Sequence, residues 1–489
     1  MKIKGATSRK LLSDILASAA QAPPLPRVLG PVSIVFMGIG AIIGAGIFVL
    51  TGTAAALFAG PAVVVSFLLA GITCVFVALC YAELATMMPV SGSTYTYTYV
   101  SLGQLAAWLV GWNLILEYSI GAAAVAVGWS GYLIGTLASI GITIPPQLSA
   151  STGQAIQLAD GTTATAIVNL PAAAIVAFLT ILLVRGTRES ALVNNIMVTL
   201  KLIVIVAFIG FGIGHISVAN WHPFVPPNSG TFGTFGWSGV LHGASVVFIT
   251  YVGFDAVSNC AQEARRPQRD MPVGILGALA IATILYVLVA GVLVGVVPYS
   301  QLNVAAPVGL AVDRMGIGWF AALVQLGALI GITTAILVLL YGQGRIFATM
   351  AQDGLMPSLF SRVHPQLKTP WMSQILIGLV VAATAAVAPI EMLSELVGGG
   401  TLFAFLMVCA AVVRLRRLEP HAVRPFRVPA VPLVPILGML SCLGLIVGLA
   451  PVTWARLLIW IAIGLVIYFA YGRSRAGHRL SGGGPQSRE

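Results

Sequence analysis

Charge is what this sequence has least of. Only 8% of its 489 residues are charged, whereas a soluble globular protein has about a quarter. Hydrophobic residues make up 58% and the mean hydropathy is +0.99, which excludes a soluble fold. Apolar runs recur along the chain, each of the length that a helix needs to cross a bilayer core of roughly 30 Å. The sequence therefore predicts an all-α polytopic membrane protein.

Cysteines are few as well, and common catalytic motifs are missing. The five cysteines lie within or beside apolar runs, so no disulfide framework is expected. The sequence contains no H-E-x-x-H pattern, phosphate-binding glycine loop or G-x-S-x-G turn. An enzyme is therefore disfavoured, and neither a cofactor nor a metal site is expected. The net charge of +11 does not indicate nucleic acid, because the basic residues are spread over short loops.

The apolar runs and the basic residues together predict a topology. Twelve membrane spans are expected, at residues 31–58, 61–88, 104–139, 167–185, 190–216, 238–263, 273–297, 318–351, 371–389, 391–413, 431–450 and 452–472. With the N-terminus inside, every lysine and arginine except Lys201, Arg314 and Arg456 lies on the inner side. This asymmetry predicts cytoplasmic termini. The cytoplasmic parts are then residues 1–30, with a stretch that lies against the headgroups, and the tail 473–489.

Glycine is frequent where it weakens a helix. The run GIGAIIGAGIF lies in the first span and ITYVGFDAVSN in the sixth, and each interior glycine costs roughly 1 kcal/mol relative to alanine. Close helix packing explains either run, but it does not explain their correspondence. Interrupted helices at matching places of two repeats mark many transporter binding sites. The sequence thus predicts inverted repeats at 31–216 and 238–413, with two added helices in 431–472.

Broken backbone offers a site for a zwitterion. A break at Gly44-Ala45-Gly46 leaves N–H groups that suit a carboxylate, at the positive end of a helix dipole. A break around Gly253 leaves carbonyl groups that suit an ammonium group. Irregular backbone at this depth is tolerated where it lines a cavity or is buried in protein. The predicted ligand is an α-amino acid.

Three ionisable residues within spans need a reason, because a charge at a helix centre costs roughly 2.5–3.5 kcal/mol. Lys201 is expected to gain and lose a proton during transport, since desolvation disfavours a charged lysine. The alternative is a side chain that extends to the inner interface. Asp255 either exchanges protons with Lys201 or caps the broken helix. Glu117 faces either the cavity or a neighbouring helix.

With these residues in hand, the chain resembles the amino acid–polyamine–organocation superfamily, specifically its cationic amino acid transporter branch, over residues 27–472. The resemblance rests on six stretches in order: GIGAIIGAGIFVLTG, CYAELATMMPVSGSTYTYTY, WNLILEYSIGAAAVAVGWSGY, VNNIMVTLKL, FDAVSNCAQEARRPQRDMP and YGQGRIFATMAQDGLMP. It implies a LeuT-type 5+5 inverted repeat with broken helices 1 and 6 and two added C-terminal helices.

The resemblance also implies roles for individual residues. The amides of Ala45 and Gly46 would hold the substrate carboxylate. The substrate amine would be held by four carbonyl groups, those of Ile42, Ile249, Thr250 and Val252. Lys201 matches a lysine of proton-coupled relatives whose ammonium takes the place of a sodium ion, and Asp255 matches a carboxylate that assists its protonation. Ala45 stands where many members have Ser or Thr, so one hydroxyl contact to the carboxylate is absent.

Substrate choice and coupling are left open by the sequence. Ile332 is expected to narrow the side-chain pocket and favour small neutral amino acids, whereas Glu117 would suit a cationic side chain. The favoured function is proton-coupled uptake of an L-amino acid by alternating access in a bacterial inner membrane. The alternatives are an exchanger of amino acids or polyamines without net proton movement, and a receptor that does not transport. No disulfide-linked partner subunit is expected, because the loop 140–166 lacks cysteine.

Overall fold

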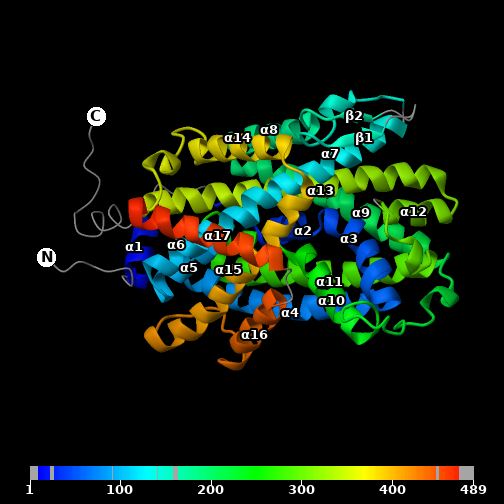
Figure 1. Cartoon of the computed structure of the whole chain (residues 1–489). Helices are drawn as coiled ribbons and strands as arrows, with labels where there is room; N and C mark the ends of the chain where they lie inside the picture. Colours follow the sequence, from blue (N-terminus) through cyan, green and yellow to red (C-terminus); the bar gives the residue numbers. More distant parts are fainter. Residues whose placement is uncertain are drawn as a thin grey trace.

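The fold is a bundle of helices, seen in a computed structural model that describes residues 9–21, 27–90, 92–139, 141–157, 163–304, 306–447 and 451–472. Figure 1 shows most helices running along one direction, with α1 and α5 at one end and α12 and the strands at the other. The predicted helical fold is confirmed. The tail 473–489 lies outside the described residues, as does much of the N-terminal segment.

Most helices overlap the predicted spans, and some, such as α11 and α15, extend several residues beyond them. The helices that overlap the spans are α2 (Pro31–Ile42), α3 (Ala45–Ala54), α4 (Val63–Met87), α6 (Gln104–Ile115), α7 (Gly121–Ser139), α8 (Leu170–Arg185), α9 (Thr187–Ile213), α10 (Gly236–Phe248), α11 (Pro267–Val296), α13 (Gly318–Gln352), α14 (Trp371–Val387), α15 (Ile390–Leu418), α16 (Leu433–Val447) and α17 (Pro451–Ile467). Three more helices lie outside them: α1 (Leu12–Gln21), α5 (Ser93–Ser101) and α12 (Pro307–Arg314).

Shorter turns complete the chain. The 3₁₀ and π turns are η1 (Ala55–Ala59), η2 (Gly60–Ala62), η3 (Leu116–Ile120), η4 (Pro146–Leu148), η5 (Val218–Trp221), η6 (Ile249–Tyr251), η7 (Phe254–Cys260), η8 (Tyr299–Gln301), η9 (Ser358–Ser361) and η10 (Tyr468–Gly472). The strands β1 (Ala155–Gln157) and β2 (Thr163–Thr165) pair antiparallel. This small hairpin in the predicted exposed loop 140–166 is the one addition to an otherwise helical fold in the described residues.

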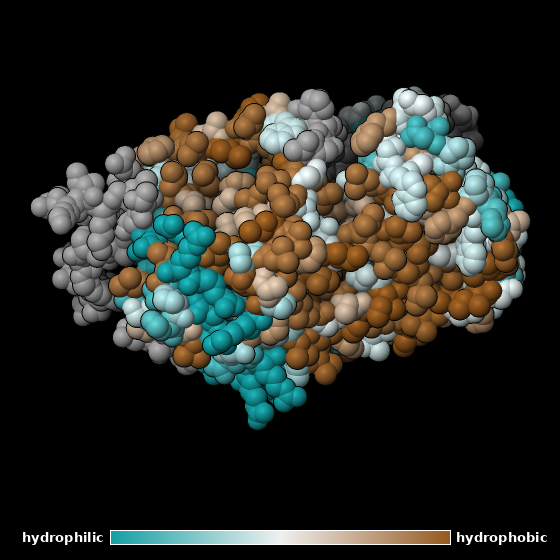
Figure 2. Space-filling model, turned by 90° about the horizontal axis from the view of Figure 1, so that it is seen from below, coloured by the Kyte–Doolittle hydropathy of each residue, from teal (hydrophilic) through white to brown (hydrophobic). Residues whose placement is uncertain are grey.

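In the part of the chain that the structure describes, seven helices are long and apolar enough to cross a membrane: Leu50–Met87, Gln104–Ala138, Ser190–Ile213, Gly236–Cys260, Pro267–Val296, Gly318–Gln352 and Trp454–Gly472. Four shorter apolar helices accompany them, at Pro31–Ile42, Leu170–Arg185, Trp371–Val387 and Leu433–Ile446. Figure 2 shows a broad hydrophobic surface across the middle of the molecule, with hydrophilic residues gathered toward its ends. Several large apolar side chains of these helices are more than half exposed, among them Ile203 of α9 and Leu379 of α14. The chain is a multi-pass membrane protein.

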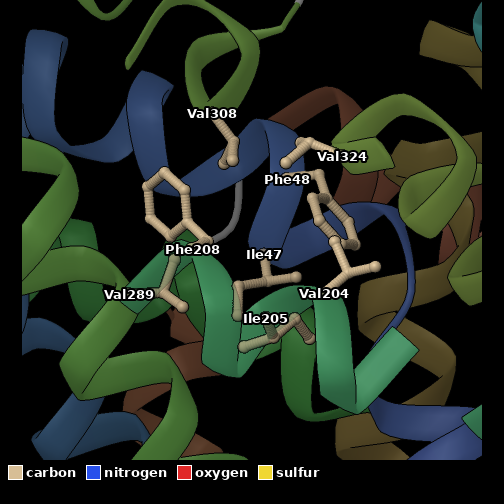
Figure 3. Close-up of a pocket in the computed structure, with 8 residues that line it drawn as sticks. All are labelled: Ile47, Phe48, Val204, Ile205, Phe208, Val289, Val308 and Val324. Atoms are coloured by element: carbon tan, nitrogen blue, oxygen red, sulfur yellow. The ribbon is translucent and has the colours of Figure 1, made fainter. Parts of the chain in front are cut away.

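The half-helix α3 is packed among apolar neighbours. Its residues Ile47 and Phe48 meet side chains from α9, α11, α12 and α13, and Figure 3 shows the eight side chains of this cluster pointing toward one another. The space left between them is only about 10 Å³, so α3 is held by close contacts. Inside a bilayer such contacts matter because lipid tails are as apolar as the side chains, and packing itself drives helix association.

Ionic contacts fasten one end of the bundle. Glu83 of α4 accepts hydrogen bonds from Arg416 of α15, at 2.9 Å from Nε and 2.7 Å from Nη2. Arg345 of α13 pairs with Glu263, which follows η7. Both carboxylates are buried, so each needs its cation. Glu83 therefore has a structural partner on another helix.

The N-terminal helix contacts this same end. Lys10, two residues before the start of α1, pairs with Asp353 at the end of α13. Tyr95 of α5 donates a hydrogen bond of 2.7 Å to the same carboxylate. The Lys10 ammonium also lies 5.2 Å from the ring centre of Tyr99. The N-terminal segment, expected to lie against lipid headgroups, thus also contacts the helix bundle.

Candidate functional site

The first break separates α2 from α3. Helix α2 ends at Ile42, Ile43 adopts φ −81° and ψ 85°, and α3 begins after Gly44 with φ −117° and ψ −143°. Neither residue has the helical conformation, so the hydrogen-bond ladder stops here. The amides of Ala45 and Gly46 lie in the first turn of α3, where an α-helix provides no acceptor for its N–H groups. The glycine run identified in the sequence is thus the place of the interruption.

The second break separates η6 from η7. Val252 is extended with ψ 136°, and Gly253 has φ +116°, a left-handed conformation that favours glycine. A Cβ atom at Gly253 would lie 2.9 Å from the Cβ of Ala41 and 3.1 Å from its carbonyl carbon. Gly253 therefore allows both the turn and the close approach of the two broken helices.

We expect Gly253→Ala to destabilise the protein by about 1–3 kcal/mol, because the new methyl group meets the Ala41 backbone and the turn requires a positive φ. The unfolding temperature of detergent-purified protein measures this. Gly135→Ala is the matched control, since Gly135 lies in α7 with no neighbour within 4 Å of its Cβ position. Equal unfolding temperatures for the two variants would contradict the close approach.

A cavity of about 230 Å³ lies between the two breaks. Seven residues that the sequence pointed to line it: Ile42, Gly44, Gly46, Glu117, Ile249, Thr250 and Val252. The rest of its wall consists of Ala41, Leu50, Gly121, Ala124, Val125, Gly128, Tyr132, Ala335, Leu339 and Val397. Glu117 supplies the only charge of this lining, and most of the other side chains are small or apolar. The cavity suits a compact ligand with an apolar side chain.

The expected role of Ile332 in narrowing the side-chain pocket stays a prediction. Ile332 is fully buried and does not line the cavity, whereas Ala335 and Leu339 on the same helix do. The turn of α13 that contains Ile332 packs behind the break, where the Cβ position of Gly331 is 3.5 Å from both Lys201 Cδ and Phe48 Cε2. The pattern of residues on α13 does not reveal the depth of the cavity, and Leu339 was missed for that reason.

Lys201 of α9 is fully buried and binds the end of the first half-helix. Its Nζ atom donates hydrogen bonds to the carbonyl oxygens of Ile39 at 3.0 Å, Gly40 at 3.3 Å and Ile43 at 2.8 Å. It also lies 2.8 Å from the hydroxyl of Thr334. Carbonyls in the last turn of a helix lack intrahelical donors and form the negative end of its dipole. Lys201 therefore points to the break and does not extend to an interface.

Tyr286 of α11 connects the two breaks. Its hydroxyl group lies 2.7 Å from the carbonyl oxygen of Ile42 and 2.9 Å from that of Thr250. These are two of the carbonyls expected to receive the substrate amine. Nothing in the sequence indicates this role, because a tyrosine within an apolar run is typical of packing. It becomes visible only when α2, η6 and α11 are brought together.

Removal of this hydroxyl group is expected to weaken substrate binding. A Tyr286→Phe variant leaves the carbonyls of Ile42 and Thr250 without their shared donor, so their positions are less fixed, and we expect KM to rise about tenfold. Tyr251→Phe is the control, because the Tyr251 hydroxyl bonds instead to the Phe67 carbonyl of α4 at 2.9 Å. Uptake kinetics of both variants test this, and an unchanged KM for Tyr286→Phe would argue against it.

Two buried acids lie close together beside the cavity. Tyr118 donates a hydrogen bond to the carboxylate of Asp255, and Asp255 and Glu117 are near enough to repel each other. Asp255 does not line the cavity, whereas Glu117 does. The partners of Lys201 are backbone and hydroxyl oxygens, so the structure does not bring Lys201 and Asp255 into direct contact. Within the described residues, no group of three or more His, Cys, Asp or Glu side chains is placed to hold a metal ion.

Comparison with known proteins agrees with this arrangement. The family model of amino acid permeases matches residues 29–470. The methylthioribose transporter of Bacillus subtilis (strain 168) is 45% identical, over 96% of this chain and 98% of its own. The branched-chain amino acid permease BcaP of the same organism is 44% identical, over 97% and 99%. Cationic amino acid transporter 9 of Arabidopsis thaliana, a chloroplastic protein, is 42% identical, over 83% and 69%. The resemblance found in the sequence is thereby confirmed, and the chain belongs to the amino acid permease family of the amino acid–polyamine–organocation superfamily.

Proposed function

We propose that this protein is a secondary active amino acid permease that couples uptake of an L-amino acid to a proton by alternating access. Its twelve membrane segments would form inverted repeats at 31–216 and 238–413, of the LeuT type, followed by two added helices in 431–472. The termini would be cytoplasmic, in a bacterial inner membrane. The paired interruptions after Ile42 and Tyr251 and the distribution of basic residues support this arrangement.

The substrate is proposed to bind across the two breaks. The amides of Ala45 and Gly46 would hold its carboxylate, and the carbonyl groups around Gly253 would hold its amine. Both roles are those expected from the sequence. The cavity of about 230 Å³ is smaller than most ligand pockets, which measure roughly 300–1,000 Å³. Its wall of glycine, alanine, valine and leucine favours a small or branched neutral side chain. The relative named as a branched-chain amino acid permease supports the same choice.

The observation that carries proton coupling is the set of oxygen atoms around Lys201. A protonated lysine has three N–H donors, and three carbonyls from the end of α2 lie within hydrogen-bond distance of its Nζ atom. Loss of the proton would remove a positive charge from the negative end of the half-helix. This would loosen the α2 end beside the substrate site. Asp255, bonded to Tyr118, is proposed to assist through the adjoining polar groups.

Uptake into proteoliposomes tests the proposal. Labelled alanine, leucine, arginine and methylthioribose would be offered with and without an inward proton gradient. Gradient-driven uptake of alanine or leucine is the expected result. Exchange without dependence on the gradient would favour an exchanger, and saturable binding without uptake would favour a receptor. Preferential uptake of arginine would instead indicate that Glu117 binds a cationic side chain of the substrate.

Methylthioribose is included because one relative, 45% identical, is named as its transporter. Uptake of methylthioribose in place of any amino acid would show that the two breaks do not select a zwitterion. The expected selectivity for a zwitterion rests on N–H groups after the first break and carbonyl groups before the second, both of which border one small cavity. Competition by unlabelled leucine measures this selectivity directly.

A further inference from the structure

The connection between α15 and α16 is held rigidly by a buried acid. Besides Arg416, Glu83 accepts a hydrogen bond of 2.7 Å from the amide of Val428 and lies 3.4 Å from Arg424 Nε. Arg424 is itself buried. Burial lowers the pKa of the Arg424 guanidinium, Glu83 opposes this shift, and the neighbouring charges of Arg416 and Arg427 add to it. Glu83 thus anchors the far end of the connection to α4.

Arg424 also fixes the backbone of this connection. Its guanidinium donates to four carbonyl oxygens of the preceding turn, namely Leu415 at 3.2 Å, Glu419 at 2.7 Å, Pro420 at 3.4 Å and Ala422 at 2.9 Å. Five donors in a planar group allow arginine to hold several acceptors at once. The loop therefore has a defined shape that does not depend on its surface side chains.

Three further arginines project from this scaffold. Arg414 and Arg417 are exposed on the last turns of α15, three residues apart and hence on one face. Arg427 is exposed in the loop, and its charge helps to lower the pKa of Arg424. In the described part of the chain none of the three has an ion pair or a hydrogen bond from its side chain. We call Arg414, Arg417 and Arg427 the arginine platform.

The loop that carries Arg427 leads within six residues into α16, whose outer side is apolar and exposed. Leu433, at the start of α16, and Leu440, two turns further, are each 58% exposed, and Val423 in the loop is 82% exposed. Apolar side chains as exposed as these on a membrane helix are in contact with acyl chains. Figure 2 looks onto this side of the molecule and shows hydrophilic residues directly beside the hydrophobic surface. A ligand here meets cationic groups and hydrocarbon together.

We propose that the arginine platform binds the headgroup phosphate of anionic phospholipids in the cytoplasmic leaflet, with their acyl chains along α16. Guanidinium groups match phosphate oxygens in a bidentate geometry. Basic residues at the end of a membrane helix attract anionic lipid, each contributing at short range. The proposal rests on the proposed orientation of the chain and not on the identity of any transported substrate.

Lipid binding by the intact, detergent-purified protein tests this proposal. A fluorescent phosphatidylglycerol would be titrated against wild type and against Arg414→Gln/Arg417→Gln/Arg427→Gln, with fluorescent phosphatidylcholine as the neutral probe. We expect wild type to prefer phosphatidylglycerol and the triple variant to lose affinity for it on the order of 100-fold. The matched control is Arg265→Gln/Arg266→Gln/Arg269→Gln, which removes the same charge from exposed positions before and within the first turn of α11. This control is expected to bind as wild type does.

Several results would overturn the proposal. Equal affinity of wild type for the two lipids would show that the anionic headgroup is not recognised. An equal loss in both triple variants would leave only a general attraction between basic protein and acidic lipid. Displacement of the lipid by millimolar inorganic phosphate would indicate a free-anion site instead. The unfolding temperature of the platform variant without lipid separates lost binding from lost folding, because the scaffold of Glu83, Arg416 and Arg424 is unchanged in it.

Discussion

Lys201→Met is expected to abolish proton-driven uptake, with a loss of at least about 100-fold. Methionine nearly preserves the length and shape of the side chain but donates no hydrogen bond. The carbonyl of Ile43, now 2.8 Å from the ammonium, would lose this donor, whereas the carbonyl of Ile39 would keep the amide of Ile43 at 2.9 Å. An unsatisfied buried group costs about 1–3 kcal/mol. The variant also lacks the only group proposed to carry the coupled proton at the break.

Two measurements separate these effects. Gradient-driven uptake reports coupling, whereas exchange of labelled for unlabelled substrate needs only the binding site and the conformational change. If Lys201 acts in coupling alone, exchange survives in Lys201→Met; if it also holds the end of α2, exchange fails and the unfolding temperature falls. Lys368→Met, at an exposed position, controls for loss of a lysine. Gradient-driven uptake at the wild-type rate in Lys201→Met would refute the coupling mechanism.

Arg345→Met is expected to give the largest loss of stability. Arg345 and Glu263 have side chains only 4% and 1% exposed, and Tyr341 donates a further hydrogen bond to Glu263. Removal of one partner of a buried ion pair leaves an uncompensated charge and costs about 3–5 kcal/mol. The pair joins the segment after η7 to α13, so its loss is also expected to favour opening of this end of the bundle.

The double variant Arg345→Met/Glu263→Gln provides the decisive comparison. Because it removes both charges, it is expected to recover much of the stability lost in Arg345→Met. Lys10→Met is the control for a less buried pair, since Lys10 is 22% exposed in its contact with Asp353, and exposed pairs contribute about 0–1 kcal/mol. The unfolding temperatures of the three variants in detergent measure their order of stability. A double variant no more stable than Arg345→Met would show that charge burial is not the cause.

Sequence alone predicted the interrupted helices because glycine has a direct physical signature. Gly44 and Gly253 lie within apolar runs where glycine weakens a helix, and both are at non-helical positions in the structure. Lys201 was equally accessible to sequence reasoning, since a charge in a membrane span requires partners. In each case a single residue type carried the information, without knowledge of its neighbours.

The other features of the site could not be predicted from the sequence, because they depend on distances between helices. Tyr286 contacts Ile42 and Thr250 from a third helix, and nothing in an apolar sequence distinguishes such a tyrosine from one that merely packs. Ile332 and Leu339 lie on the same apolar helix, and only the depth of the cavity shows that Leu339 lines it. Glu117 had two open interpretations, and its place in the cavity lining supports the first.

The position of Tyr286 has a use in spectroscopy. One hydroxyl group contacts a carbonyl from each interrupted helix, so a single nucleus beside that hydroxyl senses both helices. A fluorine atom placed on the Tyr286 ring by site-specific incorporation of 3-fluorotyrosine would give one ¹⁹F resonance for this junction. Its chemical shift would distinguish a state in which both carbonyls are held from a state in which either helix has moved away. The number of resonances during turnover would count the conformations that the substrate site visits.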